Sequence, residues 1–461
     1  MSLKPWDLAG WDAVETAERI ARKDVTALEV VEAALGRVET LQKLNAVVTP
    51  TAERARAAAA TATGPLAGVP TFIKDLAQVA GVRTAWGTAA SGTFISKKTD
   101  YAVKLIERTG LVSLGKSATP EHGLICATEP MAFGPCLNPW GLEYSTGGSS
   151  GGAAALVASG AVPIAHGSDG GGSIRIPASS CGLVGLKPTR KRLDMDGSNL
   201  LPVNIAVHGV LSRTVRDTVA FWKAIDAQRP VKKRMLTAEV ALRPKRLKVA
   251  AFFEPPTKSP IDPQMRSALE KTAAKLVELG HQVELVPFPL STSVVQDFIS
   301  LWAWVAYAQP RTGLMVRGKG FVVEQHEPWT HGFAKLFTNA KLRAFRNMFR
   351  LRQFTAEHAQ LMTKYDVLLC PTTAHPSPRL GHFASDQPFE QGLERVFAYT
   401  PFAAASNASG APAISLPLAR SDKGMPMGMH FAAAHNQEQT LLELAFELEA
   451  AAPWEKLAPR L

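Results

Sequence analysis

Two serines in glycine-rich segments and one distant lysine are the residues of this sequence best suited to chemistry. Ser149 lies in TGGSSGG, Ser173 lies in GSDGGGSIRIPASS, and Lys74 ends the apolar segment VPTFIK. A serine hydroxyl is a weak nucleophile until a neighbouring base removes its proton, and the resulting oxyanion needs fixed hydrogen-bond donors. Burial lowers the pKa of a lysine, so a lysine in apolar surroundings can serve as the base. The pattern predicts acyl transfer by a Ser-Ser-Lys set.

The surrounding elements point to an α/β fold. Between about residues 65 and 215, short apolar segments such as VPTFI, LVSLG and AVPIAHG alternate with helical ones, which is typical of a sheet covered by helices. Nearer the N-terminus, Thr26 and Glu29 form a capping box for a helix with an apolar stripe of Leu28, Val31, Leu35 and Val38. We expect a large mixed β-sheet with helices on both faces.

No linker with a clear break in composition divides the 461 residues. We therefore predict a single domain over residues 1–461, with a chemical core at about 65–215 and an aromatic, mainly helical lobe at about 290–360. The nearest candidate boundary is the basic stretch at residues 231–249. Aromatic side chains in the lobe are usually core residues, and a pocket wall for an apolar substrate is the alternative.

The net charge of +11 comes largely from that basic stretch and from the segment KLRAFRNMFRLR. For the latter we expect a solvated helix face whose arginines extend over a packed stripe containing Phe345 and Phe349. A patch for nucleic acid or an anionic membrane is the less favoured interpretation, because charge runs are weak motifs. We therefore expect neither nucleic acid nor membrane as a partner. Among protein partners only a homodimer is kept as an option, since nothing in the sequence fixes the oligomeric state.

The cysteines and the N-terminal residues favour a cytoplasmic protein. The four cysteines lack the paired spacing of a zinc site or of a small disulfide scaffold, so free buried thiols are expected. The first residues carry acidic side chains where a signal peptide needs an apolar core, and no segment offers about 18 uninterrupted apolar residues. No metal and no organic cofactor is expected.

Two short motifs invite other functions. GLVSLGKS at residues 110–117 fits the phosphate-loop pattern, but Gly110 ends a helix here and the residues after it favour a strand, which is the wrong order. GGSSG around Ser149 fits the nucleophile elbow of α/β hydrolases. The loop segment LNPWGLEYST precedes it instead of the hydrophobic strand that the elbow requires.

The strings GVPTFIKDL, TGGSSGGAAALVASG and GSDGGGSIRIPASSCGLVGLKPT together resemble the amidase signature family of serine hydrolases. Similar stretches cover nearly the whole chain. NPWGLEYSTGGSSGG and HGVLSRTVRDT are similar to the branch that includes the cyclic nylon-oligomer amidase. The resemblance implies the amidase signature fold and hydrolysis of a carboxamide C–N bond in a small linear or cyclic amide, with side activity on esters.

The resemblance also implies a role for each residue of the site. Ser173 forms the acyl-enzyme, and Ser149 relays protons between Ser173 and a neutral Lys74. The backbone N–H groups of Gly170, Gly171, Gly172 and Ser173 form the oxyanion hole, while Asp169 and Arg175 fix the loop. The Gly148–Ser149 peptide bond is cis. Cys126 and Gly148 are expected at the substrate, with Glu121 and Leu124 in the same pocket wall.

One departure from the family pattern is Gly170, where many relatives carry an alkyl or small side chain. Three consecutive glycines make the loop more flexible unless packing compensates.

Two other functions stay open. One is the amidase-like subunit of a tRNA-dependent amidotransferase, although the segment after KPT, RKRLDMDGSNLLPVN, lacks the SRYG-type sequence expected there. The other is a binding protein that has lost catalysis, which the presence of all three reactive residues disfavours.

Overall fold

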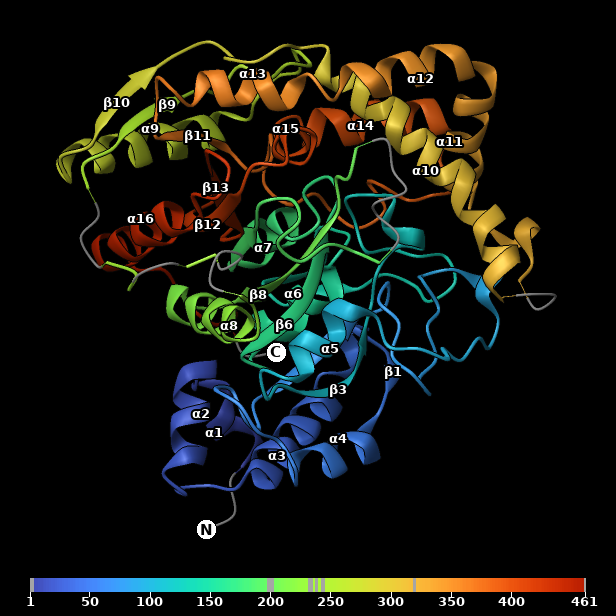
Figure 1. Cartoon of the computed structure of the whole chain (residues 1–461), viewed down its shortest axis with the longest axis vertical. Coiled ribbons are helices and arrows are strands. Elements are labelled where there is room, and N and C mark those ends of the chain that lie inside the picture. The colour runs from blue at the N-terminus through green and yellow to red at the C-terminus, as the bar shows by residue number, and fades with distance from the viewer. Residues whose placement is uncertain are drawn as a thin grey trace.

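A computed structural model describes residues 4–196, 203–230, 235–236, 239–241, 245–317 and 321–459. Figure 1 shows the N-terminal helices at one end, strands through the middle and a group of later helices at the opposite corner. Residues 231–234, 237–238 and 242–244 of the basic stretch lie outside the described residues.

A small sheet carries the predicted lysine. Its strands, in spatial order, are β1 (Val47–Pro50), β3 (Val112–Ser117) and β2 (Pro70–Lys74), with β2 parallel to β3. All five residues of β2 are buried. Because β2 also packs beside β6 (Ile164–Asp169), Lys74 is held where the small sheet meets the large one.

The N-terminal part supplies the helices α1 (Pro5–Ala9), α2 (Ala13–Ala21), α3 (Ala27–Thr40), α4 (Ala52–Ala59) and α5 (Tyr101–Glu107). Of these, α3 and α4 pack directly on the small sheet, and α1 packs on α3. The predicted capping box starts α3, with the Thr26 side chain accepting from the Glu29 N–H. The predicted stripe is partly wrong, because Leu28 is exposed. The buried face of α3 is turned toward Val30 and Ala34 instead.

The large sheet has eight strands in the order β10-β9-β11-β13-β12-β7-β8-β6. Its remaining strands are β7 (Val184–Lys187), β8 (Val207–Ser212), β9 (Lys248–Ala251), β10 (Gln282–Leu285), β11 (Val367–Pro371), β12 (Ala413–Arg420) and β13 (Pro426–Ala433). β9 pairs in parallel with β10 and β11, and the other pairs are antiparallel. The mixed sheet therefore joins strands from both sides of the basic stretch.

Helices cover both faces of this sheet, as predicted. α8 (Val215–Ala227), α9 (Pro263–Glu278) and α16 (Glu438–Ala451) pack on one face, and α6 (Gly151–Ala158) and α7 (Arg175–Cys181) pack on the other. Alternation along β6 shows why both faces need cover. Ile164 joins the core beneath the first group and Ala165 the core beneath the second.

The aromatic region is helical, in agreement with the sequence. It comprises α10 (Val294–Arg317), α11 (Pro328–Asn339), α12 (Lys341–Arg350) and α13 (Phe354–Leu361), near α14 (Phe389–Tyr399) and α15 (Ala403–Ser409). The expected packing of Phe345 and Phe349 is wrong for Phe349 and only partly met by Phe345, whose ring makes an edge contact with buried Phe337. Their exposed fractions are 41% and 56%, because α12 turns Ala344 and Met348 toward the core instead.

No helix in these described ranges is long and apolar enough to cross a lipid bilayer. The four cysteines are free and buried, as the sequence predicts.

Candidate active site

Lys74 is fully buried at the end of β2, and its Nζ lies 2.7 Å from Ser149 Oγ. The Nζ also lies 3.3 Å from the backbone oxygen of Ser168. Burial disfavours the charged form and lowers the pKa of Lys74 to about 7, while the more distant Asp169 carboxylate acts in the opposite direction. A substantial part of Lys74 is therefore neutral near pH 7 and can accept a proton from Ser149.

Two histidines hold the backbone of Lys74 in place, and nothing in the sequence predicted this contact. The Lys74 backbone N–H donates to His166 Nδ1 at 3.1 Å, and His166 Nε2 lies 2.8 Å from His208 Nδ1. Because Nδ1 of His166 accepts, its Nε2 carries the hydrogen and donates to His208. Burial lowers the pKa of His208 to about 3 and that of His166 well below its usual value. Both rings are thus neutral at physiological pH.

Ser149 sits in a tight backbone cradle just before α6. The Gly148–Ser149 peptide bond is cis. A Cβ atom at Gly148 would lie 2.7 Å from backbone atoms of Ala127, so only glycine fits. At Gly123 a Cβ would lie 3.0 Å from Ser149 Oγ, so a second glycine borders the hydroxyl.

Ser173 lies in the loop between β6 and α7, and Asp169 fixes that loop. The Asp169 carboxylate accepts from the N–H groups of Gly172 at 2.8 Å and Ile174 at 3.1 Å. The Gly172 amide is therefore engaged with a carboxylate, although the sequence reading expected it to be an oxyanion donor. In the described hydrogen bonds the amides of Gly170, Gly171 and Ser173 have no acceptor within the protein, which leaves these three as available donors.

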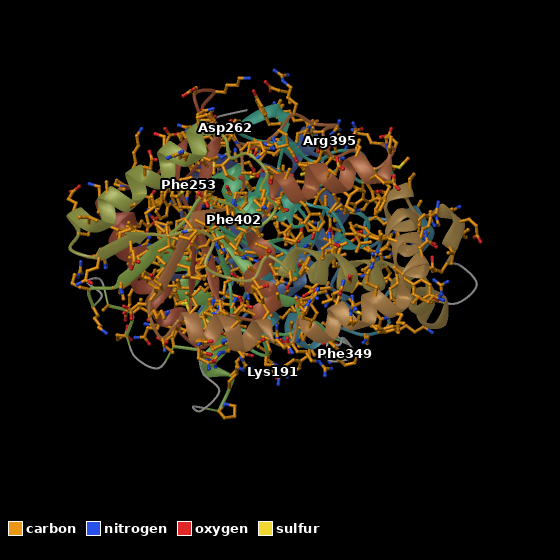
Figure 2. The ribbon with its side chains drawn as sticks, turned by 90° about the horizontal axis from the view of Figure 1, so that it is seen from above. Lys191, Phe253, Asp262, Phe349, Arg395 and Phe402 are labelled. Atoms are coloured by element: carbon orange, nitrogen blue, oxygen red, sulfur yellow. The ribbon has the colours of Figure 1, made fainter. Side chains whose placement is uncertain are left out.

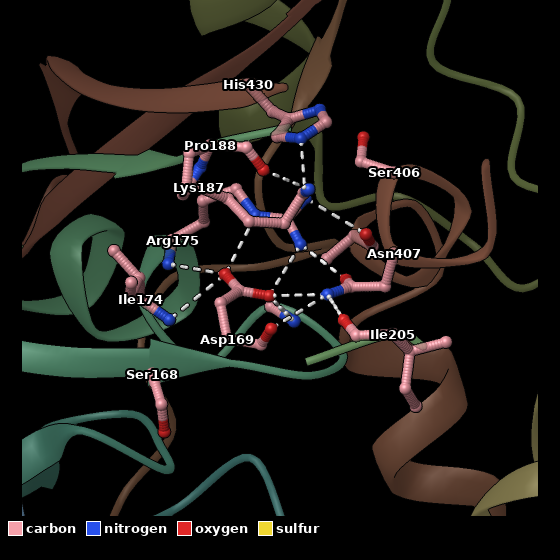
Figure 3. A network of polar contacts seen from close by, with 12 residues as sticks. Ser168, Asp169, Ile174, Arg175, Lys187, Pro188, Ile205, Ser406, Asn407 and His430 are labelled. Atoms are coloured by element: carbon pink, nitrogen blue, oxygen red, sulfur yellow. Dashed lines mark hydrogen bonds and ion pairs between the residues drawn. The ribbon is translucent and has the colours of Figure 1, made fainter. Parts of the chain in front are cut away.

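Arg175 holds Asp169 from the other side, as Figure 3 shows. The Arg175 Nε and Nη2 atoms lie 3.0 and 2.9 Å from the two carboxylate oxygens, and both side chains are fully buried. Burial alone would raise the pKa of Asp169, but the guanidinium holds it below its usual range. Asn407 also donates to Asp169 Oδ1 at 2.9 Å. Their predicted loop-fixing role agrees with these contacts.

An aromatic pair from α10 packs against the same loop. The rings of Phe298 and Trp302 stack, with centroids 5.4 Å apart. A Cβ at Gly170 would lie 3.3 Å from the Trp302 ring, and one at Gly171 would lie 3.1 Å from Phe298. This packing restrains the three-glycine run that the sequence suggested would be flexible.

A pocket opens in front of Ser173, and its walls carry no charged side chain. The lining residues all belong to the described part of the chain: Gly123, Leu124, Ile125, Cys126, Gly148, Gly171, Ser173, Ile176, Phe298, Trp302, Phe333, Val396, Phe397, Thr400 and Ala404. Apart from Ser173 itself, Thr400 supplies the only hydroxyl. The pocket therefore suits a neutral, largely apolar group.

Most of the predicted site residues meet at this pocket. Cys126, Gly148, Gly171 and Ser173 line it, while Lys74 lies behind Ser149. Glu121, which was expected in the wall, instead accepts from the N–H of Glu327 and the hydroxyl of Thr330.

Other features of the pocket differ from the prediction. The walls from α14 and α15, including Val396 and Phe397, carried no recognisable sequence signal. Within the described residues no hydrogen bond joins the Ser149 and Ser173 hydroxyls, so the second link of the relay stays a prediction.

The phosphate-loop motif has a structural role. Gly110 follows helix α5 with φ of 97°, and Lys116 lies inside β3, 2.8 Å from Asp75. A helix followed by a strand is the reverse of a phosphate loop.

Comparisons with known proteins agree with this geometry. The family model described as Amidase matches residues 29–442. A Mycobacterium tuberculosis protein named "Putative amidase AmiC" is 41% identical over 98% of this chain and 96% of its own. The solved structure of 6-aminohexanoate cyclic dimer hydrolase complexed with substrate is 31% identical, covers 97% of this chain and 98% of its own, and has a TM-score of 0.88. A bacterial aryl acylamidase structure is 26% identical, with a TM-score of 0.85 and 96% coverage of both chains.

The folded core, the pocket in front of Ser173 and these matches lead to one conclusion. The chain belongs to the amidase signature family and is an enzyme that hydrolyses amide bonds.

Proposed function

We propose that this amidase cleaves small neutral amides with an apolar or aryl acyl group through an acyl-enzyme on Ser173. The observation that carries the proposal is the 2.7 Å contact between Ser149 Oγ and a buried Lys74 whose pKa is lowered to about 7. This base lies behind a pocket whose walls are uncharged.

The first half-reaction forms the acyl-enzyme. Ser173 Oγ attacks the carbonyl carbon, its proton passes to Ser149, and the Ser149 proton passes to Lys74 Nζ. The carbonyl oxygen becomes an oxyanion that accepts from the N–H groups of Gly170, Gly171 and Ser173. When the C–N bond breaks, the proton returns from Lys74 through Ser149 to the departing nitrogen, which leaves as ammonia or an amine.

Water completes the reaction by the same route. It attacks the ester carbonyl and loses a proton toward Lys74, and Ser173 recovers that proton as the carboxylic acid leaves. Esters enter the same sequence, because an alkoxide leaves more easily than an amine. We therefore propose esterase side activity. We also propose that the enzyme works in the cytoplasm and that it needs no second kind of protein for turnover.

The test is a Ser173→Ala variant, measured with a fluorogenic anilide and with an irreversible serine reagent detected by mass spectrometry. We expect loss of turnover by a factor of about 10⁴ or more and no adduct. A matched Ser150→Ala variant, which changes the serine next to the relay, keeps measurable turnover and forms the adduct. Full activity of Ser173→Ala on the best substrate would refute the assignment.

The amidotransferase subunit is the second candidate, and its weak support is the net positive charge of +11. It predicts that the purified chain fails to hydrolyse simple amides until a partner is added. Turnover by the chain alone therefore separates the two functions.

A further inference from the structure

Helix α12 presents a row of apolar side chains to solvent. Leu342, Phe345 and Phe349 are exposed to 87%, 41% and 56%. Their spacing of three and four residues places them on one face of the helix. Figure 2 shows the region of Phe349 at the edge of the molecule. Large apolar side chains gathered in this way on a surface helix mark an interaction site rather than scattered exposure.

Cations border the apolar row. Arg343, Arg346 and Arg350 repeat the same spacing one residue further along, so they form a second row beside the first. Arg350 pairs with Asp297, whereas Lys341, Arg343 and Arg346 form no ion pair among the described residues. No acidic residue occurs between Glu327 and Glu357, so the segment keeps a net positive charge even though Asp297 compensates Arg350.

The opposite face of α12 anchors the helix firmly. Ala344, Met348 and Leu351 are buried in the same apolar cluster as Phe298 and Phe333 of the pocket wall. The exposed row therefore cannot turn inward without emptying the core. This explains why Phe345 and Phe349, which the sequence predicted to be packed beneath the arginines, are exposed instead.

We propose that α12 docks the enzyme on an anionic lipid surface, which reverses the expectation from the sequence, because that expectation placed Phe345 and Phe349 in the core. An apolar row flanked by arginines is the pattern of helices that lie in the membrane interface, where apolar side chains enter the acyl boundary and cations contact acidic headgroups. A second copy fits less well, because facing rows would bring two sets of arginines together. Nucleic acid would use the charge but leave the apolar row in water.

The buried face of α12 also packs on α10, which supplies Phe298 and Trp302 of the pocket wall, so the docking helix lies directly behind that wall. If the proposed preference for apolar amides holds, docking brings the pocket near a phase in which such amides concentrate. The docking itself does not depend on that preference and is tested without turnover.

The experiment is co-sedimentation of the full chain with vesicles of phosphatidylcholine alone or mixed with an equal part of phosphatidylglycerol. We expect binding to the anionic vesicles, weaker binding at high salt and little binding to the neutral ones. The Leu342→Ser/Phe349→Ser and Arg343→Glu/Arg346→Glu variants are each expected to bind about tenfold more weakly or worse.

Matched controls change exposed residues elsewhere on the surface. Ile95→Ser/Leu285→Ser alters apolar side chains that are 58% and 63% exposed, and Lys271→Glu/Lys364→Glu makes the same charge change. Both controls are expected to bind like the unaltered protein. All variants are first checked for an unchanged thermal transition and for hydrolysis of a water-soluble amide without vesicles.

Three results would overturn the proposal. They are absence of binding to the anionic vesicles, equal losses in the α12 variants and the controls, and a dimer in sedimentation velocity that Leu342→Ser/Phe349→Ser dissociates. The last result would make the row an interface between copies. Loss of vesicle binding with intact hydrolysis would leave the proposed function untouched.

Discussion

Two buried lysines on neighbouring strands make different contacts in this protein, and we propose different roles for them. Lys74 ends β2 and Lys116 lies in the adjacent β3, where it is the register partner of Ile73. Both side chains are almost completely inaccessible to solvent. Lys116 contacts the Asp75 carboxylate at 2.8 Å, whereas Lys74 contacts the Ser149 hydroxyl and a backbone oxygen. A lysine whose side chain contacts a carboxylate forms a structural ion pair, as Lys116 does. A buried lysine without such a contact, like Lys74, can be neutral and is suited to act as a base.

Lys187 sharpens the comparison. Burial and the nearby Arg175 lower its pKa to about 7, as in Lys74, but its Nζ donates to the Pro188 carbonyl. A lowered pKa therefore does not by itself distinguish the proposed base from Lys187. The proposed mechanism also requires contact with a hydroxyl that leads to Ser173, which Lys74 supplies through Ser149.

The largest expected effect is that of Lys74→Met, which keeps the volume of the side chain but removes the base. Because positioned bases contribute about 10² to 10⁴ in rate, kcat should fall by about 10³. Lys187→Met is the matched control, since it removes a lysine of similar burial and pKa and should change kcat by less than about tenfold. Similar losses in the two variants would remove the distinction between them.

The next effect concerns stability. Asp75→Asn leaves Lys116 buried beside a neutral amide, and breaking a buried ion pair costs about 3–5 kcal/mol in the free energy of unfolding. Urea denaturation measures this loss. The double variant Asp75→Asn/Lys116→Met, which removes both charges, should recover much of it. A double variant no more stable than the single one would contradict the ion-pair interpretation.

The smallest effect is a pH profile. In the proposed mechanism the neutral form of Lys74 is active, and burial lowers the pKa of Lys74 to about 7, so kcat/KM should fall as the pH drops through 7. It should be about tenfold lower at pH 6 than at pH 8. The Lys187→Met variant should keep the same midpoint. A flat profile between these pH values would mean that Lys74 is not the titrating base.

Local signals predicted much of the fold and the chemistry. Thr26 and Glu29 cap a helix through contacts between residues three positions apart. Lys74 ends an apolar segment, which predicts its burial, and Ser149 lies in a glycine-rich segment, which predicts a tight backbone around it. The order of helix, Gly110 and strand was likewise readable, because it depends on neighbouring residues. The alternation of strand and helix was enough to indicate an α/β sheet covered by helices.

Contacts between distant segments could not be predicted. Asp75 and Lys116 were both visible in the sequence, but only the register of β2 and β3 brings them together. Engagement of the Gly172 amide by Asp169 depends on the curve of the loop. Helix α12 has apolar side chains on two faces, and only the packing of the whole lobe decides which face is buried. The exposure of Phe349 therefore could not be predicted from the sequence.

The aromatic stack of Phe298 and Trp302 has a consequence for how this enzyme can diversify. The same two rings form a wall of the pocket and lie against Gly170 and Gly171 near Ser173. Substitutions that reshape this wall will also shift the two glycine amides, which the proposed mechanism uses to bind the oxyanion. Selectivity and speed are thus mechanically linked here, and directed evolution of one should be accompanied by compensating changes in the other.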